Sequence, residues 1–129
     1  MKEQQLQIMC VNWFRLQYPS LFIFAVPNGG SRHKLEAINL RREGATKGVS
    51  DLIIMLPKGR VVFVEMKRPA SQKMNFKTGN WNKVAGGKQS PEQKAFQETA
   101  ETLGFEYLLI DSFDLFVNKM QLAVDNNAT

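Results

Sequence analysis

Apolar positions along the chain alternate between helical and strand-like patterns. Apolar residues at three- and four-residue spacing predict a helix over 3–17, which Pro19 ends. Short apolar runs predict strands at 21–26, 51–56, 60–67 and 105–110. Further helices are expected at 31–43, at 91–103 and after a cap at Asp111 or Ser112. This order is typical of an α/β fold in which helices flank a mixed central sheet.

The segment Pro57-Lys58-Gly59 connects the two central apolar runs. Proline in the second position and a left-handed glycine predict a type I turn within a three-residue hairpin loop that carries a bulge. Such a loop makes Leu56 and Arg60 the flanking pair. Because both strands are apolar on both faces, we expect them to lie centrally in the sheet, covered on each side.

The register of this hairpin decides where three charged side chains lie. Counting back from the flanking pair places Asp51 opposite Glu65, and Lys67 shares the face of Glu65 because strand side chains alternate. A two-residue loop would instead pair Asp51 with Met66 and separate the carboxylates. The alternative interpretation is an exposed Glu65–Lys67 ion pair at a frayed strand end, with Asp51 as a turn residue.

Two carboxylates at adjacent strand ends repel each other, which raises a pKa or recruits a cation such as Mg²⁺. A metal there could lower the pKa of a bound water, and a neighbouring lysine could orient that water or hold a phosphate. These are the groups required for hydrolysis of a phosphodiester. The apolar strands and the turn chemistry favour this interpretation over the surface ion pair.

Composition sets the broad class. The 129 residues with 43% hydrophobic content suit one domain, expected over 1–124, with a disordered tail at 125–129. The net charge of +5 favours a polyanionic partner such as nucleic acid. The chain has no apolar stretch that could span a membrane, residues 1–10 lack the apolar core and cleavage site expected of a signal peptide, and the single cysteine, Cys10, excludes an internal disulfide. A cytoplasmic location is therefore expected.

Residues 68–89 predict an irregular basic excursion. Six basic residues and no acidic residue lie between Glu65 and Glu92, and Trp81 lies among them. This composition suits a nucleic-acid contact, in which lysines supply charge and Trp81 stacks on bases. The alternatives are a mobile basic loop, or a dimer contact through Trp81 and Phe76.

The surrounding motifs occur in the order of a known family. Asp51 with Glu65-Met66-Lys67 resembles the D…(D/E)xK core of the restriction-endonuclease-like nucleases. Over residues 3–117 the chain resembles the virus-type replication-repair nuclease (VRR-NUC) domain. The motifs are a helix bearing Glu3, Pro27-Asn28-Gly29, Gly44…Gly48-Val49-Ser50-Asp51, Val64-Glu65-Met66-Lys67 and Gln89-Ser90…Gln93. Ser50 stands where the family usually has proline, a structural position.

The resemblance implies a restriction-endonuclease-like core, metal ligation by Asp51, Glu65 and the backbone carbonyl of Met66, and a catalytic Lys67. It also implies that Gln93 and Glu3 lie next to the metal, with Glu3 a possible ligand. Their simpler interpretations are a capping box for Gln93 and a helix-start carboxylate favoured by the helix dipole for Glu3. Expected DNA-contacting residues are Asn28, Gly30, Arg32, Lys34, Lys47, Arg68, Lys73, Lys77, Trp81 and Lys88. His33 is the only histidine, which argues against a histidine-based zinc site.

By the same resemblance, the expected activity is that of a Mg²⁺- or Mn²⁺-dependent, structure-specific DNA endonuclease. Free-standing members of the family resemble homodimeric resolvases of four-way (Holliday) junctions, which implies branched DNA as substrate and a bacterial or phage-infected cell. The alternatives are a non-catalytic nucleic-acid-binding module on the same fold, which predicts a broken acidic set, and a restriction-type or flap-type nuclease. A restriction-type enzyme would need a recognition region larger than residues 68–89.

Overall fold

The structure, a computed structural model, describes residues 1–27 and 34–126. Its helices are α1 (Glu3–Gln17), α2 (Lys34–Arg42), α3 (Pro91–Thr102) and α4 (Phe113–Asn126). Its strands are β1 (Phe22–Ala25), β2 (Leu52–Met55), β3 (Val61–Met66), β4 (Ser71–Met74), β5 (Trp81–Val84) and β6 (Glu106–Ile110). Each helix and strand predicted from the hydrophobic pattern has a counterpart here, although positions 31–33 of the helix predicted at 31–43 lie outside the described residues, and β4 and β5 are additional.

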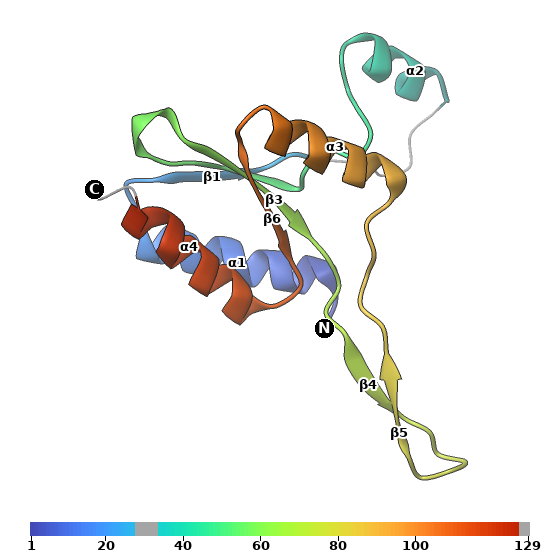
Figure 1. The fold of residues 1–129 in the computed structure, drawn as a ribbon. Helices are drawn as coiled ribbons and strands as arrows, with labels where there is room; N and C mark the ends of the chain where they lie inside the picture. Colours follow the sequence, from blue (N-terminus) through green and yellow to red (C-terminus); the bar gives the residue numbers. More distant parts are fainter. Residues whose placement is uncertain (28–33, 127–129) are drawn as a thin grey trace.

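The main sheet has four strands in the order β1-β2-β3-β6. β1, β2 and β3 pair antiparallel, whereas β6 runs parallel to β3 after the crossover through α3. Helices α1 and α4 lie together on one face, and α3 lies on the other (Figure 1). The predicted α/β architecture, a mixed sheet flanked by helices, is confirmed.

The hydrophobic core lies between the sheet and the α1–α4 pair. Its fully buried side chains include Leu6, Cys10, Phe14, Leu52, Ile54, Val62, Val64, Met66, Phe116 and Met120. Burial raises the pKa of the Cys10 thiol to about 12, so this cysteine behaves as a small apolar core residue. On this support, β2 and β3 occupy the two central positions of the sheet.

The hairpin between β2 and β3 has the predicted register. The Leu56 amide donates to the Arg60 carbonyl at 2.9 Å, and Leu52 pairs with Val64, so the next pair outward is Asp51 with Glu65. The predicted type I geometry is wrong at Lys58, which has φ 62° and is left-handed like Gly59. Successive residues with positive φ match the twist of antiparallel strands. The three-residue loop, and with it the register, is unchanged.

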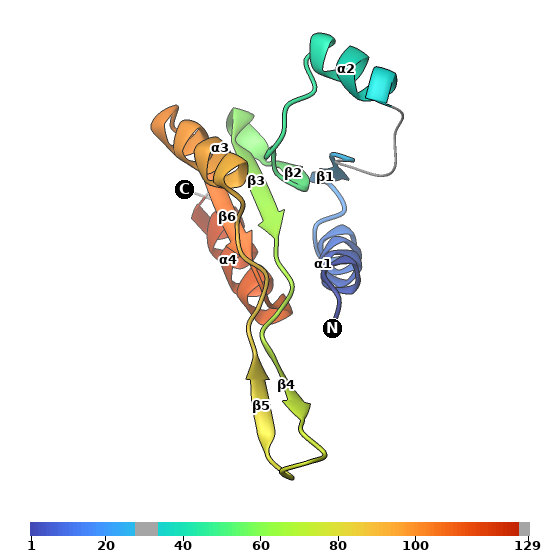
Figure 2. The ribbon, with the colours of Figure 1, turned by 90° about the vertical axis from the view of Figure 1, so that its right-hand side faces the viewer.

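The basic segment 68–89 is a β-hairpin and not an irregular excursion. β4 and β5 pair antiparallel, with Ser71 opposite Val84 and Met74 opposite Trp81. Most of its side chains are polar on both faces, so no apolar alternation marked it as strands. The hairpin projects from the same side of the molecule as α2, with the start of α3 between them (Figures 1 and 2).

The C-terminal helix is longer than predicted. α4 runs through Asn126 and so includes the first two positions of the segment 125–129, whose disorder stays a prediction. Ala123 is buried and Val124 packs against the core, which holds the last helical turn in place. Residues 127–129 lie outside the described residues. Within 1–27 and 34–126, none of the helices has the length and apolar character needed to cross a membrane.

Candidate active site

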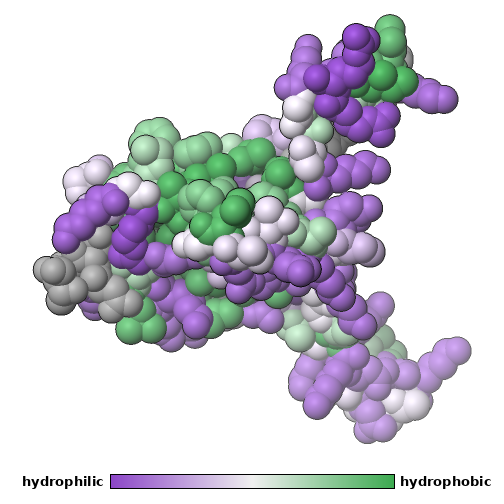
Figure 3. All heavy atoms as spheres, turned by 45° about the horizontal axis from the view of Figure 1, so that its top comes forward, coloured by the Kyte–Doolittle hydropathy of each residue, from purple (hydrophilic) through white to green (hydrophobic). Residues whose placement is uncertain are grey.

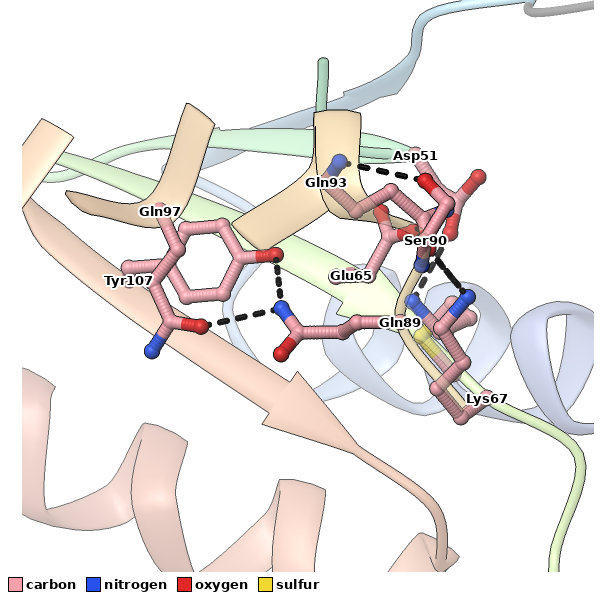
Figure 4. A network of polar contacts seen from close by, with 9 residues as sticks. Asp51, Glu65, Lys67, Gln89, Ser90, Gln93, Gln97 and Tyr107 are labelled. Carbon is pink, nitrogen blue, oxygen red and sulfur yellow. Dashed lines mark hydrogen bonds and ion pairs between the residues drawn. The ribbon is translucent and has the colours of Figure 1, made fainter. Parts of the chain in front are cut away.

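Asp51 and Glu65 meet where β2 begins and β3 ends (Figure 4). Glu65 is fully buried, and Asp51 is partly buried. The Val26 amide donates to the backbone carbonyl of Asp51 at 2.8 Å, and the Met66 amide donates to Asp51 Oδ2 at 2.8 Å. Because the N–H and C=O of a strand residue point to the same side, the Met66 carbonyl also faces Asp51. Two carboxylates and one backbone carbonyl therefore converge.

Lys67 lies beside this pair on the same face as Glu65. Its side chain is almost buried, and Nζ donates to Gln93 Oε1 at 2.7 Å. Nζ also lies 3.6 Å from Glu65 Oε1, and the Gln93 amide Nε2 donates to that same oxygen. The alternative interpretation, a surface ion pair at a frayed strand end, is therefore excluded, because Glu65 and Lys67 are both buried and both contact Gln93.

The second carboxylate oxygen of Glu65 is buried and has no hydrogen-bond partner among the described residues. Burial raises the pKa of Glu65 to about 8, the negative charge of Asp51 and a hydrogen bond that protonated Glu65 makes to Asp51 add to this effect, and Lys67 opposes it. Leaving a buried acceptor unpartnered is unfavourable. A hard divalent cation with oxygen ligands would satisfy it, so the donor set fits such an ion.

The fit is limited to this donor set. Within residues 1–27 and 34–126, no three His, Cys, Asp or Glu side chains are grouped closely enough to hold a metal ion. Glu3 therefore does not form a ready-made three-carboxylate centre with Asp51 and Glu65. The backbone carbonyl of Met66 is the third donor that this geometry supplies.

Glu3 lies near the pair, on the wall of a cleft of about 740 Å³ that Asp51 and Gln93 also line. Partial burial raises the pKa of Glu3, and the charge of Asp51 is the next cause, while Lys67 and Arg68 oppose it. Arg41 and Lys47, from the end of α2 and the loop that follows, also line this cleft. The cleft is therefore lined by both acidic and basic side chains.

The start of α3 fixes Gln93. Ser90 Oγ accepts from the backbone amide of Gln93 at 3.1 Å, and Gln93 Oε1 accepts from the backbone amide of Ser90 at 2.8 Å. These two hydrogen bonds confirm the predicted capping box. The same Oε1 receives the Lys67 ammonium, so the cap and the site contact share one oxygen. Gly48, before Asp51, packs against this helix start, because a Cβ there would lie 2.4 Å from the Glu92 carbonyl oxygen.

The predicted DNA-contacting residues divide into several groups. Asn28, Gly30 and Arg32, together with His33, lie outside the described residues. Lys34 begins α2, and Lys47 lines the cleft. The remaining five are exposed on or beside the hairpin: Arg68, Lys73, Lys77, Trp81 and Lys88. The structure thus brings Asp51, Glu65, Lys67 and Gln93 together, with Glu3 nearby on the wall of the cleft, and spreads the basic residues over both projections.

One polar network beside Glu65 was missed by the sequence reasoning (Figure 4). Gln89 Nε2 donates to Gln97 Oε1 at 2.9 Å and to the Tyr107 hydroxyl at 3.2 Å. Burial raises the pKa of Tyr107 to about 12, and the charge of Glu65 is the next cause. An aromatic hydroxyl within the apolar run FEYLLI was the available signal. The network ties the end of the basic segment to α3 and β6.

Comparison with known proteins identifies the fold. No protein-family model and no curated protein matches the chain. A search of solved structures finds a VRR_NUC domain protein with a TM-score of 0.66 and 20% sequence identity, covering 97% of this chain and 89% of that chain. The chain therefore shares the α/β fold of that VRR_NUC domain protein, which agrees with the sequence resemblance. At this level of identity the likeness concerns the fold.

Proposed function

We propose that the chain is a Mg²⁺- or Mn²⁺-dependent endonuclease that hydrolyses phosphodiester bonds in branched DNA. The observation that carries this proposal is the fully buried Glu65 beside Asp51, with one carboxylate oxygen unpartnered in the described part of the chain. A non-catalytic binding module would be expected to have lost this acidic set. Retaining a buried, repelling carboxylate pair is unfavourable for stability alone, so a role in chemistry is the better account.

Asp51, Glu65 and the backbone carbonyl of Met66 would hold the cation, with Glu3 as a further proposed ligand. A bound cation supplies Lewis acidity and lowers the pKa of a bound water. Lys67 places a positive charge and hydrogen-bond donors next to Glu65 Oε1. From there its ammonium can orient the attacking water or hold an oxygen of the scissile phosphate as a point charge.

Gln93 acts as a positioning residue in this proposal. Its side-chain amide donates to Glu65, and its side-chain carbonyl accepts from Lys67, so one side chain sets the distance between the Glu65 carboxylate and the Lys67 ammonium. Because the capping box fixes that side chain, the orientation of Lys67 depends on the start of α3. The helix end thereby preorganises the site before substrate arrives.

Several features support DNA as the substrate. The net charge of +5 and the exposed lysines of the two projections favour a polyanion. Hydrophilic residues dominate both projections and the surface between them (Figure 3). The cleft beside Asp51 lies on this side and is large enough to admit a nucleotide. A four-way junction is the proposed preferred substrate, with flap-type and restriction-type cleavage as the competing outcomes.

We propose that the active form is a homodimer, because two symmetric sites can cut two strands of a symmetric junction. Phe22 and Met55 support such an interface: they lie on the face of the sheet that carries α3, beyond the part that α3 covers, and are 59% and 50% exposed. Light scattering at micromolar concentration should give twice the 14.7 kDa chain mass. A monomeric mass at that concentration would contradict the dimer.

The function is tested by incubating the purified chain with labelled linear, flap, splayed and four-way DNA, in Mg²⁺, in Mn²⁺ and in EDTA. Metal-dependent cleavage is expected, fastest on a branched substrate, and Asp51→Asn should abolish it while DNA binding persists. Asp114→Asn, an exposed carboxylate on α4, is the matched control and should cut normally. A wild-type chain that binds branched DNA but never cuts it with either metal would favour the binding module.

A further inference from the structure

The hairpin of β4 and β5, residues 71–84, is hereafter called the hairpin arm. It projects away from the sheet (Figure 2), and its two largest apolar side chains are left in solvent. Phe76 is 93% exposed and Trp81 is 62% exposed. A two-stranded hairpin of mainly polar residues is marginally stable alone, and exposed aromatic side chains are unfavourable in water. The exposed aromatic side chains therefore indicate that the arm is a binding surface, on which a partner would cover Phe76 and Trp81.

Phe76 lies at the tip of the arm, in a loop that is held by its own hydrogen bonds. Asn75 Oδ1 accepts from the amides of Lys77 and Thr78 at 2.9 and 3.3 Å, and the Asn75 amide donates to the Asn80 carbonyl at 2.8 Å. Gly79 supplies the positive φ, 73°, that closes the loop. Phe76 lies between these contacts, so its exposure follows from the geometry of the turn.

The base of the arm is tied to the candidate active site. The Gly87 amide donates to the Arg68 carbonyl at 2.9 Å, directly after Lys67. A Cβ on Gly86 would lie 2.7 Å from that same carbonyl oxygen, so the close approach of the two chain segments requires glycine. Phe76 lies nine positions after Lys67, and at about 3.3 Å per residue the tip reaches at most about 30 Å from the site, about nine nucleotide steps.

The charge of the arm selects the class of partner. Lys73, Lys77 and Lys83 are exposed on it, and the chain has no acidic residue between Glu65 and Glu92. A second copy of the same arm would bring like charges together, which is unfavourable. A polyanion that also offers flat apolar rings would satisfy the lysines and the aromatic residues at once. Nucleic acid with unpaired bases has both properties.

We propose that the hairpin arm binds unpaired or unstacked bases at the branch of a DNA substrate, with Phe76 and Trp81 stacking on bases and the arm lysines contacting phosphates. This inference rests on the proposed function for the choice of DNA as substrate. It adds the structural feature that is recognised: single-stranded character within about 30 Å of the scissile phosphate. Paired duplex, whose bases are stacked on each other, offers the arm only phosphates.

The test measures binding in EDTA, so that it does not depend on cleavage. Fluorescence anisotropy compares a labelled splayed-arm DNA with a fully paired duplex of the same length. Phe76→Ala and Trp81→Ala should each weaken binding to the splayed DNA by about tenfold and leave duplex binding nearly unchanged. Leu16→Ala removes an apolar side chain that is 85% exposed on α1 and should bind both like wild type.

A second readout uses the unsubstituted protein. The chain has two tryptophans, and Trp13 packs against Tyr18, Phe113 and Phe116 in the body of the molecule. Unlabelled single-stranded DNA should therefore quench mainly the Trp81 emission, and Trp81→Phe should lose this quenching. This measurement does not require that an alanine variant keep the arm folded.

Two results would overturn the inference. One is arm variants that bind splayed DNA as tightly as wild type, with no quenching of Trp81. The other is arm variants that become monomeric and lose binding to both DNAs equally, which would assign the arm to self-association. A cleavage assay distinguishes failure of the arm proposal from failure of the proposed nuclease function. If the wild-type chain cuts DNA and the arm variants bind normally, only the proposed role of the hairpin arm is refuted. If binding depends on the arm but no cleavage occurs, only the proposed nuclease activity is refuted.

Discussion

The buried carboxylate of Glu65 predicts how the metal-free protein responds to pH. Burial, with the charge of Asp51, raises the pKa of Glu65 from its ordinary value of 4.5 to about 8. The folded state therefore holds the Glu65 proton more tightly than the unfolded state does. Protonated Glu65 stabilises the fold, and its full contribution is present below about pH 4.5. That contribution is lost as the pH rises to about 8. The two pKa values differ by about 3.5, and a pKa difference of one corresponds to ~1.4 kcal/mol. Glu65 therefore contributes at most about 5 kcal/mol to the free energy of unfolding.

The substitution Glu65→Gln isolates this effect. Glutamine has the same size, stays neutral at every pH, and its oxygen can still accept from the Gln93 amide. Urea unfolding in EDTA, followed by tryptophan fluorescence from pH 5 to pH 9, should show the wild-type free energy of unfolding falling relative to the variant by several kcal/mol. The two proteins should converge near pH 5. Glu98→Gln, an exposed position on α3, controls for removal of one carboxylate.

Divalent metal should reverse the loss. At pH 8, Mg²⁺ at about a hundred times its dissociation constant should restore about 2.7 kcal/mol to the wild-type protein and nothing comparable to the variant. Parallel wild-type and Glu65→Gln curves between pH 5 and pH 9 would refute the reasoning, because they would mean that Glu65 carries its charge in the fold without penalty.

Two further predictions concern the start of α3. Gly48→Ala should lower the free energy of unfolding by more than about 3 kcal/mol, because the new Cβ meets helix backbone at φ 89°, whereas Gly44→Ala, in open space at φ 111°, should cost about 1 kcal/mol in urea unfolding. Gln93→Ala should reduce cleavage at least tenfold, because it releases the site lysine, while Ser90→Ala should cost about 1 kcal/mol of stability and leave most of the activity. Equal activity losses for the two would assign Gln93 to the cap alone.

The fold could be predicted largely from sequence because its strands are continuous apolar runs bounded by turn residues. The loop length at Pro57–Gly59 fixed the β2–β3 register even though the backbone at Lys58 is left-handed and not type I. The hairpin arm could not be found this way, because its strands bury no apolar face and hence show no alternation. Hydrophobic patterning reports burial, and a strand pair that stands in solvent leaves no such signal.

The candidate site could be located from the register of the β2–β3 hairpin more than from any sequence motif. Placing Asp51 opposite Glu65 required one count of residues, and the structure has that pairing. The dual contact of Gln93 was not accessible, because a capping box explains the residue fully until the tertiary position of Lys67 is known. Tyr107 was hidden for the same reason: its hydroxyl matters only once α3 brings Gln89 against β6.

The central claim is that Lys67, held between Glu65 and Gln93, serves phosphodiester cleavage. It is tested most directly by single-turnover cleavage of saturating branched DNA with Mg²⁺, comparing wild type with Lys67→Met. Methionine keeps much of the buried side-chain volume and removes the charge, and Lys119→Met on the exposed face of α4 controls for the lost charge. The account predicts a loss of at least a hundredfold in the cleavage rate at unchanged DNA affinity. Cleavage by Lys67→Met at the wild-type rate would contradict it.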